Sequence, residues 1–307
     1  MNLKICYHLL LCFIFISTKK LFNKHKNRIN LSFAINNKYI DILLIPLVSL
    51  FENSSINSIY HIYILVGKDF EENNSQLLYN LEKIYFNCFI HIINLGSDFE
   101  GVYKSFLDIS IYYRLKLPIL CPNLNRIIYL DSDSIILKDL LQLYTLNFEG
   151  NYILARLDKY TDELDKFEIY INNYINTGVM LIDLYNLRKY KYTDKFMKYI
   201  EKHNDSLYLN AHDQTLINYV CHDKIGILKP EYHMWPYRSK KDFIEENNEL
   251  RIKYDLNDIS IAIHNPFIVH FPGNFKYKEE LRDISYYKTY YDCVIKTKEI
   301  KLTLIKR

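Results

Sequence analysis

Two aspartates separated by one serine follow an apolar run near the middle of the chain. Ile127 to Leu130 are β-branched, aromatic or aliphatic, which predicts a short strand buried on both faces. Asp131, Ser132 and Asp133 come next, and side chains at i and i+2 of an extended backbone lie on the same side. Two such carboxylates repel each other unless a divalent cation lies between them. The spacing therefore predicts a site for Mg²⁺ or Mn²⁺, ions that commonly bridge to substrate phosphates.

Taken alone, this pair also fits a solvated turn, so the interpretation depends on polar residues elsewhere in the chain. Each of them borders an apolar run, and each has an ordinary explanation as a surface charge, a turn residue, a helix N-terminal charge or a satisfied core histidine. Their combination, in this order along the chain, is what favours a functional site. They are Arg114, Asn176, Asp213, Gln214, His270 and Lys276.

The elements that must position these residues alternate between strand and helix in the first half of the chain. Such alternation predicts an α/β sheet with parallel strands. Apolar spacing predicts strands at 29–34, 61–66, 88–95, 127–130 and 152–156. It predicts helices at 40–50, 72–85, 110–120 and near Leu140. In the second half it predicts a strand at 178–182, helices at 192–201 and 213–220, and short strands at 261–263 and 267–271.

The composition is that of a globular protein with a large core. The chain has 307 residues, 49% hydrophobic and 24% charged, enough for one large domain with appendages. Its formal net charge of +3 is too small to indicate nucleic-acid binding. The 6 cysteines include no C-x-x-C pair, which argues against zinc and against a disulfide framework. We expect them to be reduced core residues of a protein on the cytoplasmic side.

Both ends of the chain differ from the middle. Residues 1–28 form an extension with an apolar run from Ile5 to Ser17, shorter than the ~20 residues of a spanning helix and followed by basic residues. If inserted, this run would leave the rest of the chain cytoplasmic, but a segment packed on the domain or on a membrane surface fits equally well. Residues 280–307 interleave aromatic and basic side chains, which suits either an anionic membrane interface or a solvated terminal helix.

Six segments, taken in order, make residues 30–278 resemble glycosyltransferase family 8. The resemblance implies an α/β fold of the GT-A, Rossmann-like type for a catalytic domain at 29–279, with a mixed, mainly parallel central sheet flanked by helices. It also implies a nucleotide-sugar donor, usually UDP-linked, a manganese ion, and retention of anomeric configuration. The nearest group is the bacterial enzymes that build lipopolysaccharide. The segments are 33–39, 114–115, 129–133, 176–180, 213–218 and 270–276.

The resemblance assigns the metal and the donor to particular residues. It matches Asp131 and Asp133 to the metal-binding pair and His270 to the third protein ligand. A set of two oxygens and one nitrogen favours Mn²⁺, since imidazole is a poor ligand for Mg²⁺. The donor-binding residues that it implies are Ala34, Asn36, Asn37, Tyr39, Arg114, Asp131, Ser132, Gly273 and Lys276.

It also matches Asn176, Asp213 and Gln214 to residues that line the sugar near the reacting carbon. No pair of carboxylates in the sequence can be shown to straddle the glycosidic bond, and Gln214 is a poor nucleophile. We therefore expect front-face attack rather than two displacements, with Asp213 and Gln214 stabilising developing positive charge. Asp158 is expected to contact the sugar or the acceptor.

The chain departs from the family pattern in two loops. Where the family usually has an acidic residue that accepts a hydrogen bond from uracil, Asn36 or Asn37 stands, and Lys38 replaces a usual asparagine. An asparagine carbonyl can still accept this bond, so we expect a UDP-hexose donor. Tyr277 and Lys278 stand in place of the usual Pro-Trp, so the loop that closes over the phosphates is expected to differ.

The expected function is transfer of a hexose from a UDP-sugar to a hydroxyl of a saccharide or glycolipid acceptor, in lipopolysaccharide or other surface-glycan synthesis. We expect a cytoplasmic enzyme with peripheral contact at the inner face of the membrane. One alternative is a Mg²⁺-dependent phosphate-transferring enzyme, which needs a small hydroxyl residue and glycine soon after the second aspartate, where Ser134-Ile135-Ile136 stand. The other is a non-catalytic sugar-binding module, against which the full set of polar residues argues.

Overall fold

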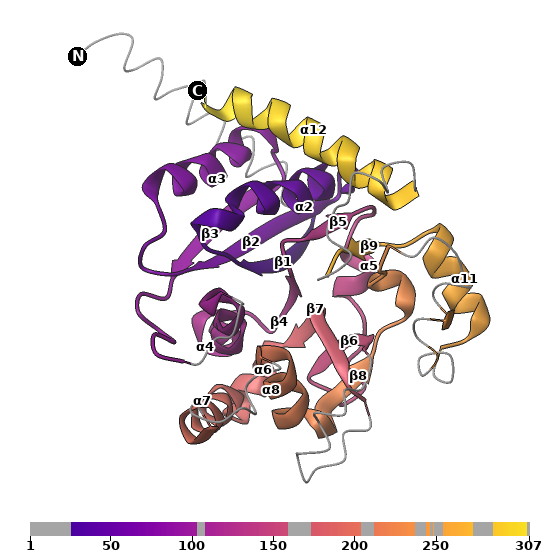
Figure 1. The fold of residues 1–307 in the computed structure, drawn as a ribbon. Helices are drawn as coiled ribbons and strands as arrows, with labels where there is room; N and C mark the ends of the chain where they lie inside the picture. The colour runs from indigo at the N-terminus through magenta and orange to yellow at the C-terminus, as the bar shows by residue number, and fades with distance from the viewer. Residues whose placement is uncertain are drawn as a thin grey trace.

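A seven-stranded sheet forms the centre of the computed structural model (Figure 1). The structure describes residues 26–102, 108–158, 173–203, 212–236, 244–245, 248, 254–272 and 285–305. The strand order is β3-β2-β1-β4-β7-β6-β8. These strands are β1 (Asn27–Ala34), β2 (Ser58–Val66), β3 (Cys88–Asn94), β4 (Arg126–Leu130), β6 (Ile153–Leu157), β7 (Ile175–Asp183) and β8 (Ile225–Ile227).

The sheet is mixed and mainly parallel, as predicted. The pairs β1–β2, β2–β3, β1–β4 and β6–β8 are parallel, while β7 runs antiparallel to both of its neighbours, β4 and β6. The amino end of β7 therefore lies at the same edge of the sheet as the carboxyl ends of β4 and β6. That edge receives the polar residues that the sequence singled out.

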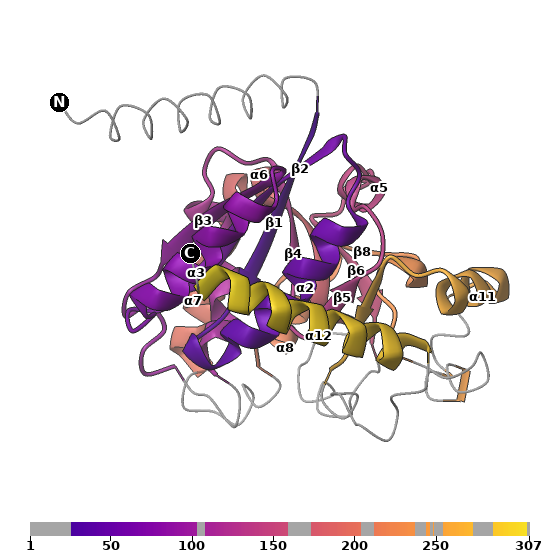
Figure 2. The same ribbon diagram turned by 90° about the horizontal axis from the view of Figure 1, so that it is seen from above.

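Helices cover both faces of the sheet, and an apolar core fills each interface (Figures 1 and 2). One face packs against α2 (Ile40–Asn53), α3 (Glu72–Ile84) and α5 (Leu141–Tyr144). The opposite face packs against η2 (Ile109–Lys116), α4 (Leu117–Leu120), α6 (Leu184–Lys189), α7 (Tyr192–His203) and α8 (His212–Val220). The smaller elements are η1 (Asn37–Tyr39), η5 (His222–Lys224), η6 (Pro230–Tyr232) and α11 (Leu256–His264).

A two-stranded antiparallel sheet joins the middle of the chain to a segment near its end. Its strands are β5 (Ser134–Ile136), directly after the two aspartates, and β9 (Ile268–His270), and Ser134 pairs with His270. The four β-branched residues of β5 and β9, Ile135, Ile136, Ile268 and Val269, are fully buried there. This pairing brings His270 to the carboxylates over 137 residues of sequence.

Two expectations about local structure need correction. The short strand predicted at 261–263 is wrong, because Ile261 and Ile263 lie in α11, where the Asp255 side chain caps the helix by accepting from Asn257 N. The helix predicted at 110–120 is a 3₁₀ helix followed by one α-helical turn. In addition, β7 begins at Ile175, so the residues expected to precede that strand lie inside it.

The C-terminal helix α12 (Ser285–Ile305) packs across α2 and α3 (Figure 2). Lys296 pairs with Glu52 and Lys301 pairs with Asp41, both on α2. A groove of about 590 Å³ lies between α2 and α12. Residues 285–305 therefore form a helix that packs on the fold, whereas the sequence left open a tail at a membrane interface or a solvated terminal helix.

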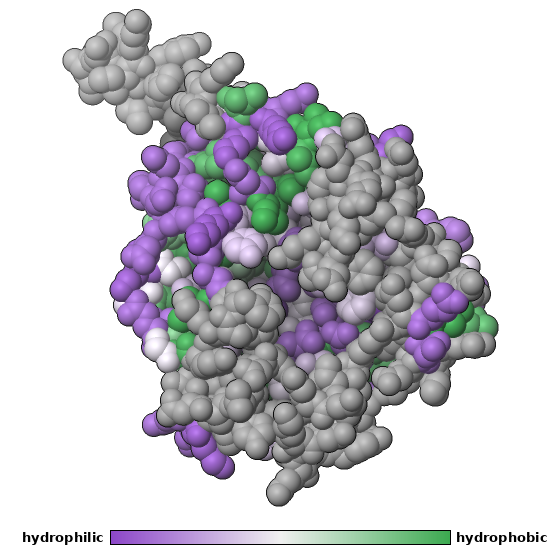
Figure 3. Space-filling model, in the orientation of Figure 1, coloured by the Kyte–Doolittle hydropathy of each residue, from purple (hydrophilic) through white to green (hydrophobic). Residues whose placement is uncertain are grey.

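Residues 1–25 lie outside the described part, so the expectation for the apolar N-terminal run stays a prediction. Among the described helices, none is both long and apolar enough to cross a membrane. Cys88, Cys121 and Cys221 are buried and Cys293 is half-buried, and all four are free thiols. The hydropathy-coloured surface shows hydrophilic residues at the bottom of a hollow near the centre of the face drawn in Figure 3.

Candidate active site

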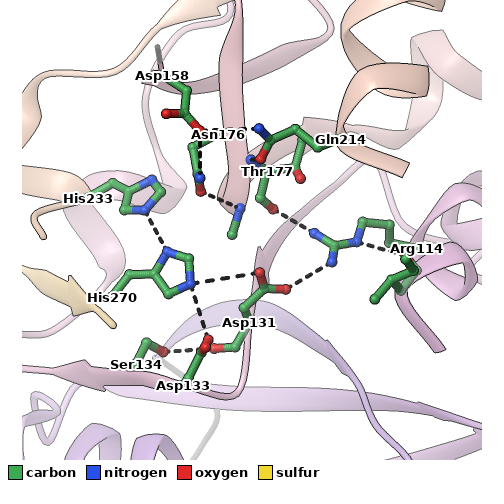
Figure 4. Close-up of polar contacts among 12 residues, drawn as sticks. Arg114, Asp131, Asp133, Ser134, Asp158, Asn176, Thr177, Gln214, His233 and His270 are labelled. Carbon is green, nitrogen blue, oxygen red and sulfur yellow. Dashed lines mark hydrogen bonds and ion pairs between the residues drawn. The ribbon is translucent and has the colours of Figure 1, made fainter. Parts of the chain in front are cut away.

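The carboxylates stand at the carboxyl end of β4, held by backbone contacts on both sides. Asp131 N donates to Gly178 O of β7 at 2.8 Å, and Phe271 N donates to Asp133 O at 2.8 Å. The Ser134 hydroxyl donates to Asp131 O at 2.9 Å, which closes the turn between β4 and β5. The backbone of the Asp-Ser-Asp segment is thus tied to β7 and to the residue that follows β9, and Figure 4 shows Ser134 beside the two aspartates.

Asp131, Asp133 and His270 form a candidate metal site, as predicted. One possible ligand atom from each residue lies within 4.8 Å of the other two. His270 Nε2 is 3.1 Å from Asp133 Oδ1 and 3.8 Å from Asp131 Oδ2. Burial lowers the pKa of His270, the charges of Asp133 and Asp131 raise it, and the net direction is upward. The structure therefore favours positive charge at this point, and the donor set fits a divalent cation.

Gly178 allows the His270 ring to lie directly against β7. A Cβ at position 178 would be 2.2 Å from His270 Cε1 and 2.6 Å from its Nδ1. Atoms cannot approach so closely, so either the ring or the strand would have to move. Glycine is needed here because of this close approach and not because of its backbone conformation.

We expect Gly178→Ala to weaken Mn²⁺ binding by about 10-fold or more, because it displaces a ligand, and to lower stability by about 1–3 kcal/mol. Isothermal titration with Mn²⁺ and thermal unfolding measure the two effects. Gly226→Ala is the matched control, since a Cβ there would lie 2.5 Å from Leu154 Cδ2, away from the metal site. It should lower stability by a similar amount and leave Mn²⁺ affinity unchanged. Equal Mn²⁺ affinity in both variants would contradict the contact argument.

Arg114 connects the metal site to three elements of the fold. Its side chain is 5% exposed. Nη2 donates to Asp131 Oδ1 at 3.0 Å, Nη1 to Thr177 O at 2.7 Å and Nε to Ile111 O at 3.0 Å. The guanidinium also lies 4.2 Å from the Tyr129 ring centroid. The predicted donor-site arginine is therefore the residue that orients Asp131.

Asp213 is a second buried carboxyl beside the same arginine. Its Oδ2 lies 2.9 Å from Arg114 Nε, but that N–H is directed at Ile111 O, so the contact is between charges and not a hydrogen bond. Burial raises the pKa of Asp213 to about 6, with Arg114 lowering it and Asp131 raising it. The N-terminal turn of α8 places this carboxyl close to the edge of the sheet.

The third group of polar residues is an amide network centred on Asp158. Asp158 Oδ2 accepts from Asn176 Nδ2 at 2.9 Å and from Gln214 Nε2 at 3.1 Å. Gln214 Nε2 also lies within 3.2 Å of Tyr174 OH, and Gln214 Oε1 accepts from Thr177 N at 3.2 Å. The structure thus brings together Asn176 and Gln214, which the resemblance placed at the sugar, and Asp158 fixes both amides.

A cavity of about 420 Å³ lies at the carboxyl ends of β1, β2 and β3, where the nucleotide is expected. Asn36 and Asn37 line it with Asp69 and Tyr113. The Asn37 carbonyl oxygen accepts from Glu71 N and Asn74 Nδ2, and its amide donates to Asp69 O. Asn37 therefore maintains the shape of the loop.

The remaining residues assigned to the donor lie as follows. Among the described residues, Lys38 N alone donates to Asn36 Oδ1, so this oxygen retains a lone pair for a base. Ala34, at the end of β1, and Tyr39, in η1, are half-buried at the same edge, and Ser132 is half-buried between the aspartates. Gly273 and Lys276 lie outside the described residues, so their roles stay predictions.

His233 is the site residue that sequence reasoning missed. Its Nε2 lies 3.0 Å from His270 Nδ1, and its side chain is fully buried (Figure 4). Burial, together with the charges of His270 and Arg156, keeps the pKa of His233 well below its ordinary value, so the ring is neutral. A lone histidine in an apolar segment is usually a core residue, so no sequence signal distinguished it.

The sheet, the cluster of two carboxylates and a histidine, and the adjoining cavity and amide network define a nucleotide-sugar glycosyltransferase of the GT-A fold. The family model described as glycosyl transferase family 8 matches residues 30–277, and the chain belongs to this family. Membership in it excludes the phosphate-transferring alternative, and the converging polar residues argue against a decayed, non-catalytic module.

Curated relatives agree with this assignment. The chain is 28% identical over 236 residues to General stress protein A of Bacillus subtilis (strain 168), covering 75% of this chain and 80% of the relative. It is 26% identical over 243 residues to Lipopolysaccharide 1,2-glucosyltransferase of Escherichia coli, covering 76% and 70%. A crystal structure of the galactosyltransferase LgtC with donor and acceptor sugar analogues superposes with a TM-score of 0.69, at 18% identity, over 87% of this chain and 96% of that chain. The structural match confirms the GT-A fold.

Proposed function

We propose that the protein transfers a hexose from a UDP-sugar, with Mn²⁺ and with retention of configuration, to a hydroxyl of a saccharide or glycolipid acceptor in surface-glycan synthesis. The observation that carries the proposal is the convergence of Asp131, Asp133 and His270 beside the amide network of Asp158. The similarity to a lipopolysaccharide glucosyltransferase supports this class of acceptor.

Separate groups of residues in the site would bind the diphosphate and the sugar. When bound, a divalent ion supplies the positive charge that neutralises the diphosphate leaving group. Asp131, Asp133 and His270 would hold it, and Arg114 keeps Asp131 in place from the buried side. The amide network faces the same space and is suited to hydrogen-bond sugar hydroxyls, because its carboxylate fixes the orientation of both amides.

The contacts of the nearby carboxyls support front-face attack. Asp213 is buried beside Arg114, and Asp158 accepts two amide N–H groups. Neither carboxylate is arranged as a free nucleophile, which a double displacement requires. Developing positive charge at the sugar would instead be stabilised by Asp158 and by the carbonyl oxygen of Gln214.

We expect the protein to bind UDP at least about 10-fold more tightly than GDP in the presence of Mn²⁺, since one base-specific hydrogen bond contributes about 1.4 kcal/mol. The Asn36 carbonyl can accept the uracil N3–H, whereas the Asn37 carbonyl already has two donors. Titration calorimetry with UDP, GDP and CDP tests this, followed by a panel of UDP-hexoses assayed for release of UDP.

Two matched variants distinguish a residue that recognises the base from a residue that maintains the loop conformation. Asn36→Asp should strengthen UDP binding, because a carboxylate is a stronger acceptor for the uracil N–H. Asn37→Asp should not, because it removes the hydrogen bond to Asp69 O and adds charge inside the loop. Tighter binding of GDP than of UDP by the unmodified protein would reject the proposed donor.

Peripheral contact with an anionic membrane is the second part of the proposal. Exposed lysines of α12 would make this contact. Lys296 and Lys301 are paired with α2, so the exposed lysines of α12 that form no ion pair with the described residues are Lys288 and Lys298. Lys306 and Arg307 lie outside the described residues. Each basic residue near an anionic leaflet contributes up to about 1 kcal/mol.

We expect the protein to sediment with anionic phospholipid vesicles at low salt and to be released at high salt. Lys288→Glu with Lys298→Glu should weaken binding by roughly 30-fold or more, the loss of about 2 kcal/mol. Lys198→Glu with Lys202→Glu, on exposed positions of α7, is the matched control and should have little effect. Truncation of α12 is unsuitable, since Tyr286 and Thr297 are buried in the fold. Protein that stays in the supernatant at low salt would rule out surface attachment.

A further inference from the structure

His270 contacts a second buried histidine on the side away from the carboxylates. His233 Nε2 lies 3.0 Å from His270 Nδ1, with the ring centroids 5.1 Å apart. The two residues are 0% and 2% exposed. Met234 N donates to Ile268 O and His270 N donates to Met234 O, so the segment after η6 runs along β9. Backbone hydrogen bonds therefore fix the two rings relative to each other.

The role of His270 Nε2 decides the direction of this hydrogen bond. Nε2 faces Asp133 Oδ1 and is the nitrogen that would bind a metal ion, so it must present a lone pair there. A neutral imidazole then carries its proton on Nδ1, the nitrogen that faces His233. His233 Nε2 is therefore the acceptor, and the proton of His233 lies on its own Nδ1.

This arrangement leaves a buried donor unsatisfied. His233 Nδ1 has no hydrogen-bond partner among the described residues. The charge of Arg156 acts on His233, but a guanidinium has only donors and cannot accept this proton. Buried polar groups normally have partners, and leaving one without a partner lowers stability. The benefit of a histidine at position 233 must therefore come from its contact with His270.

We propose that His233 is a positioning residue for the candidate metal site, accepting the Nδ1 proton of His270 and so directing Nε2 at Asp131 and Asp133. The proposal rests on the metal site proposed above. A half-turn of the His270 ring would place Cε1 where Nε2 now faces the carboxylates. It would also break the hydrogen bond to His233, which therefore opposes it. Gly178 bounds the other side of the ring, 2.2 Å from Cε1 if it carried a Cβ.

The test compares metal affinity with stability in two variants of the full chain. Mn²⁺ binding in the presence of UDP is measured by titration calorimetry, and unfolding is followed by heating. His233→Phe removes the acceptor and should weaken Mn²⁺ binding by about 10- to 100-fold, the usual effect of losing a partner of a metal ligand. Its melting temperature should equal or exceed that of the unmodified protein, because the unsatisfied donor is gone. His233→Gln can restore an acceptor near the Nε2 position and should bind Mn²⁺ within a few-fold of the unmodified protein.

The structure offers a matched control. His61 on β2 and His91 on β3 form a second histidine pair, with Nδ1 of His61 2.9 Å from Nε2 of His91. This distance is close to that between His233 and His270, and the pair is not part of the candidate metal site. His91→Phe removes this contact and should leave Mn²⁺ affinity unchanged. Unchanged Mn²⁺ affinity in His233→Phe would overturn the positioning role.

If His233→Phe does not fold, the proton positions decide the question in the unmodified protein. Long-range ¹H–¹⁵N spectra of the form bound to Mg²⁺ and UDP distinguish the two tautomers of each histidine. We expect the proton of both His233 and His270 on Nδ1, and an Nε2 proton on His233 would overturn the proposal. If the unmodified protein binds no divalent ion, the metal site itself is wrong and the positioning role is rejected with it. Binding that is equal in the unmodified protein and the variant rejects only the role of His233.

Discussion

Asp133→Ala and Asp131→Ala will each lower the rate of sugar transfer by about 100-fold or more, the loss expected when the charge that stabilises a leaving group is removed. Only Asp131→Ala will also destabilise the fold markedly. Both carboxylates face His270 Nε2, so both are needed to hold a metal ion. The two carboxylates differ in their contact with the buried Arg114, which donates a hydrogen bond to Asp131 and not to Asp133.

Loss of Asp131 leaves that guanidinium with Asp213 as its remaining carboxyl neighbour. Breaking a fully buried ion pair costs about 3–5 kcal/mol, and we expect about 1–3 kcal/mol here, because the Asp131 side chain is 29% exposed and Asp213 remains. Initial rates with Mn²⁺, and thermal unfolding without metal, separate the two effects. Full activity of either variant, or of the unmodified protein in excess EDTA, would refute the metal site.

Arg114→Met will be the most destabilising single change at the site, with a loss of about 3–5 kcal/mol at pH 8. The methionine fills part of the space but leaves Asp213 as a buried carboxyl without its cation. It also removes the donors to Thr177 O and Ile111 O. Urea unfolding monitored by fluorescence measures the loss.

The penalty will depend on pH, and the sign follows from Asp213. In the folded protein its pKa is raised from 3.8 to about 6, mainly by burial, while Arg114 lowers it. Without Arg114 this pKa rises further. A carboxyl whose folded pKa is raised stabilises the fold fully only below its unfolded pKa, and that contribution is lost as pH rises through the folded value. We therefore expect a smaller penalty for Arg114→Met at pH 5 than at pH 8.

The double variant Arg114→Met with Asp213→Asn is the control for this argument. It removes the buried charge together with its partner, so it should recover part of the lost stability at pH 8 and lose the dependence on pH. A penalty that is equal at pH 5 and pH 8, or a double variant less stable than Arg114→Met, would contradict the role given to Asp213.

The candidate metal site could be predicted because its residues carry their chemistry in their side-chain types. Asp131 and Asp133 follow a strand whose apolar run is unambiguous, and the resemblance supplied His270, whose distance in sequence no local pattern could bridge. The strands β1 to β4 were predictable for the same reason, since their β-branched runs end in polar loops. The mainly parallel sheet followed from alternation of strands and helices.

The wrong strand prediction and the missed site residues also have local causes. The segment 261–263 is a short apolar run, and periodicity cannot distinguish a strand from a helix in so short a run. In the structure it lies in a helix whose N-terminus is capped by the Asp255 side chain. His233 could not be recognised, because its function depends on which nitrogen of another histidine it faces. The contribution of Thr177 is a backbone carbonyl that accepts from Arg114, and a side-chain pattern contains no record of it.

The ion pairs between α12 and α2 have a consequence for biosynthesis. The helix α2 is completed early in translation, while α12, which packs against it, is made about 230 residues later, which at 5–20 residues per second is a delay of about 10–50 s. During that interval Ile42 and Ile45, which line the groove beneath α12, have no cover from it. The apolar face of α2 therefore stays uncovered in the nascent chain until α12 emerges. Burial of this groove is therefore a late event in the synthesis of residues 26–305.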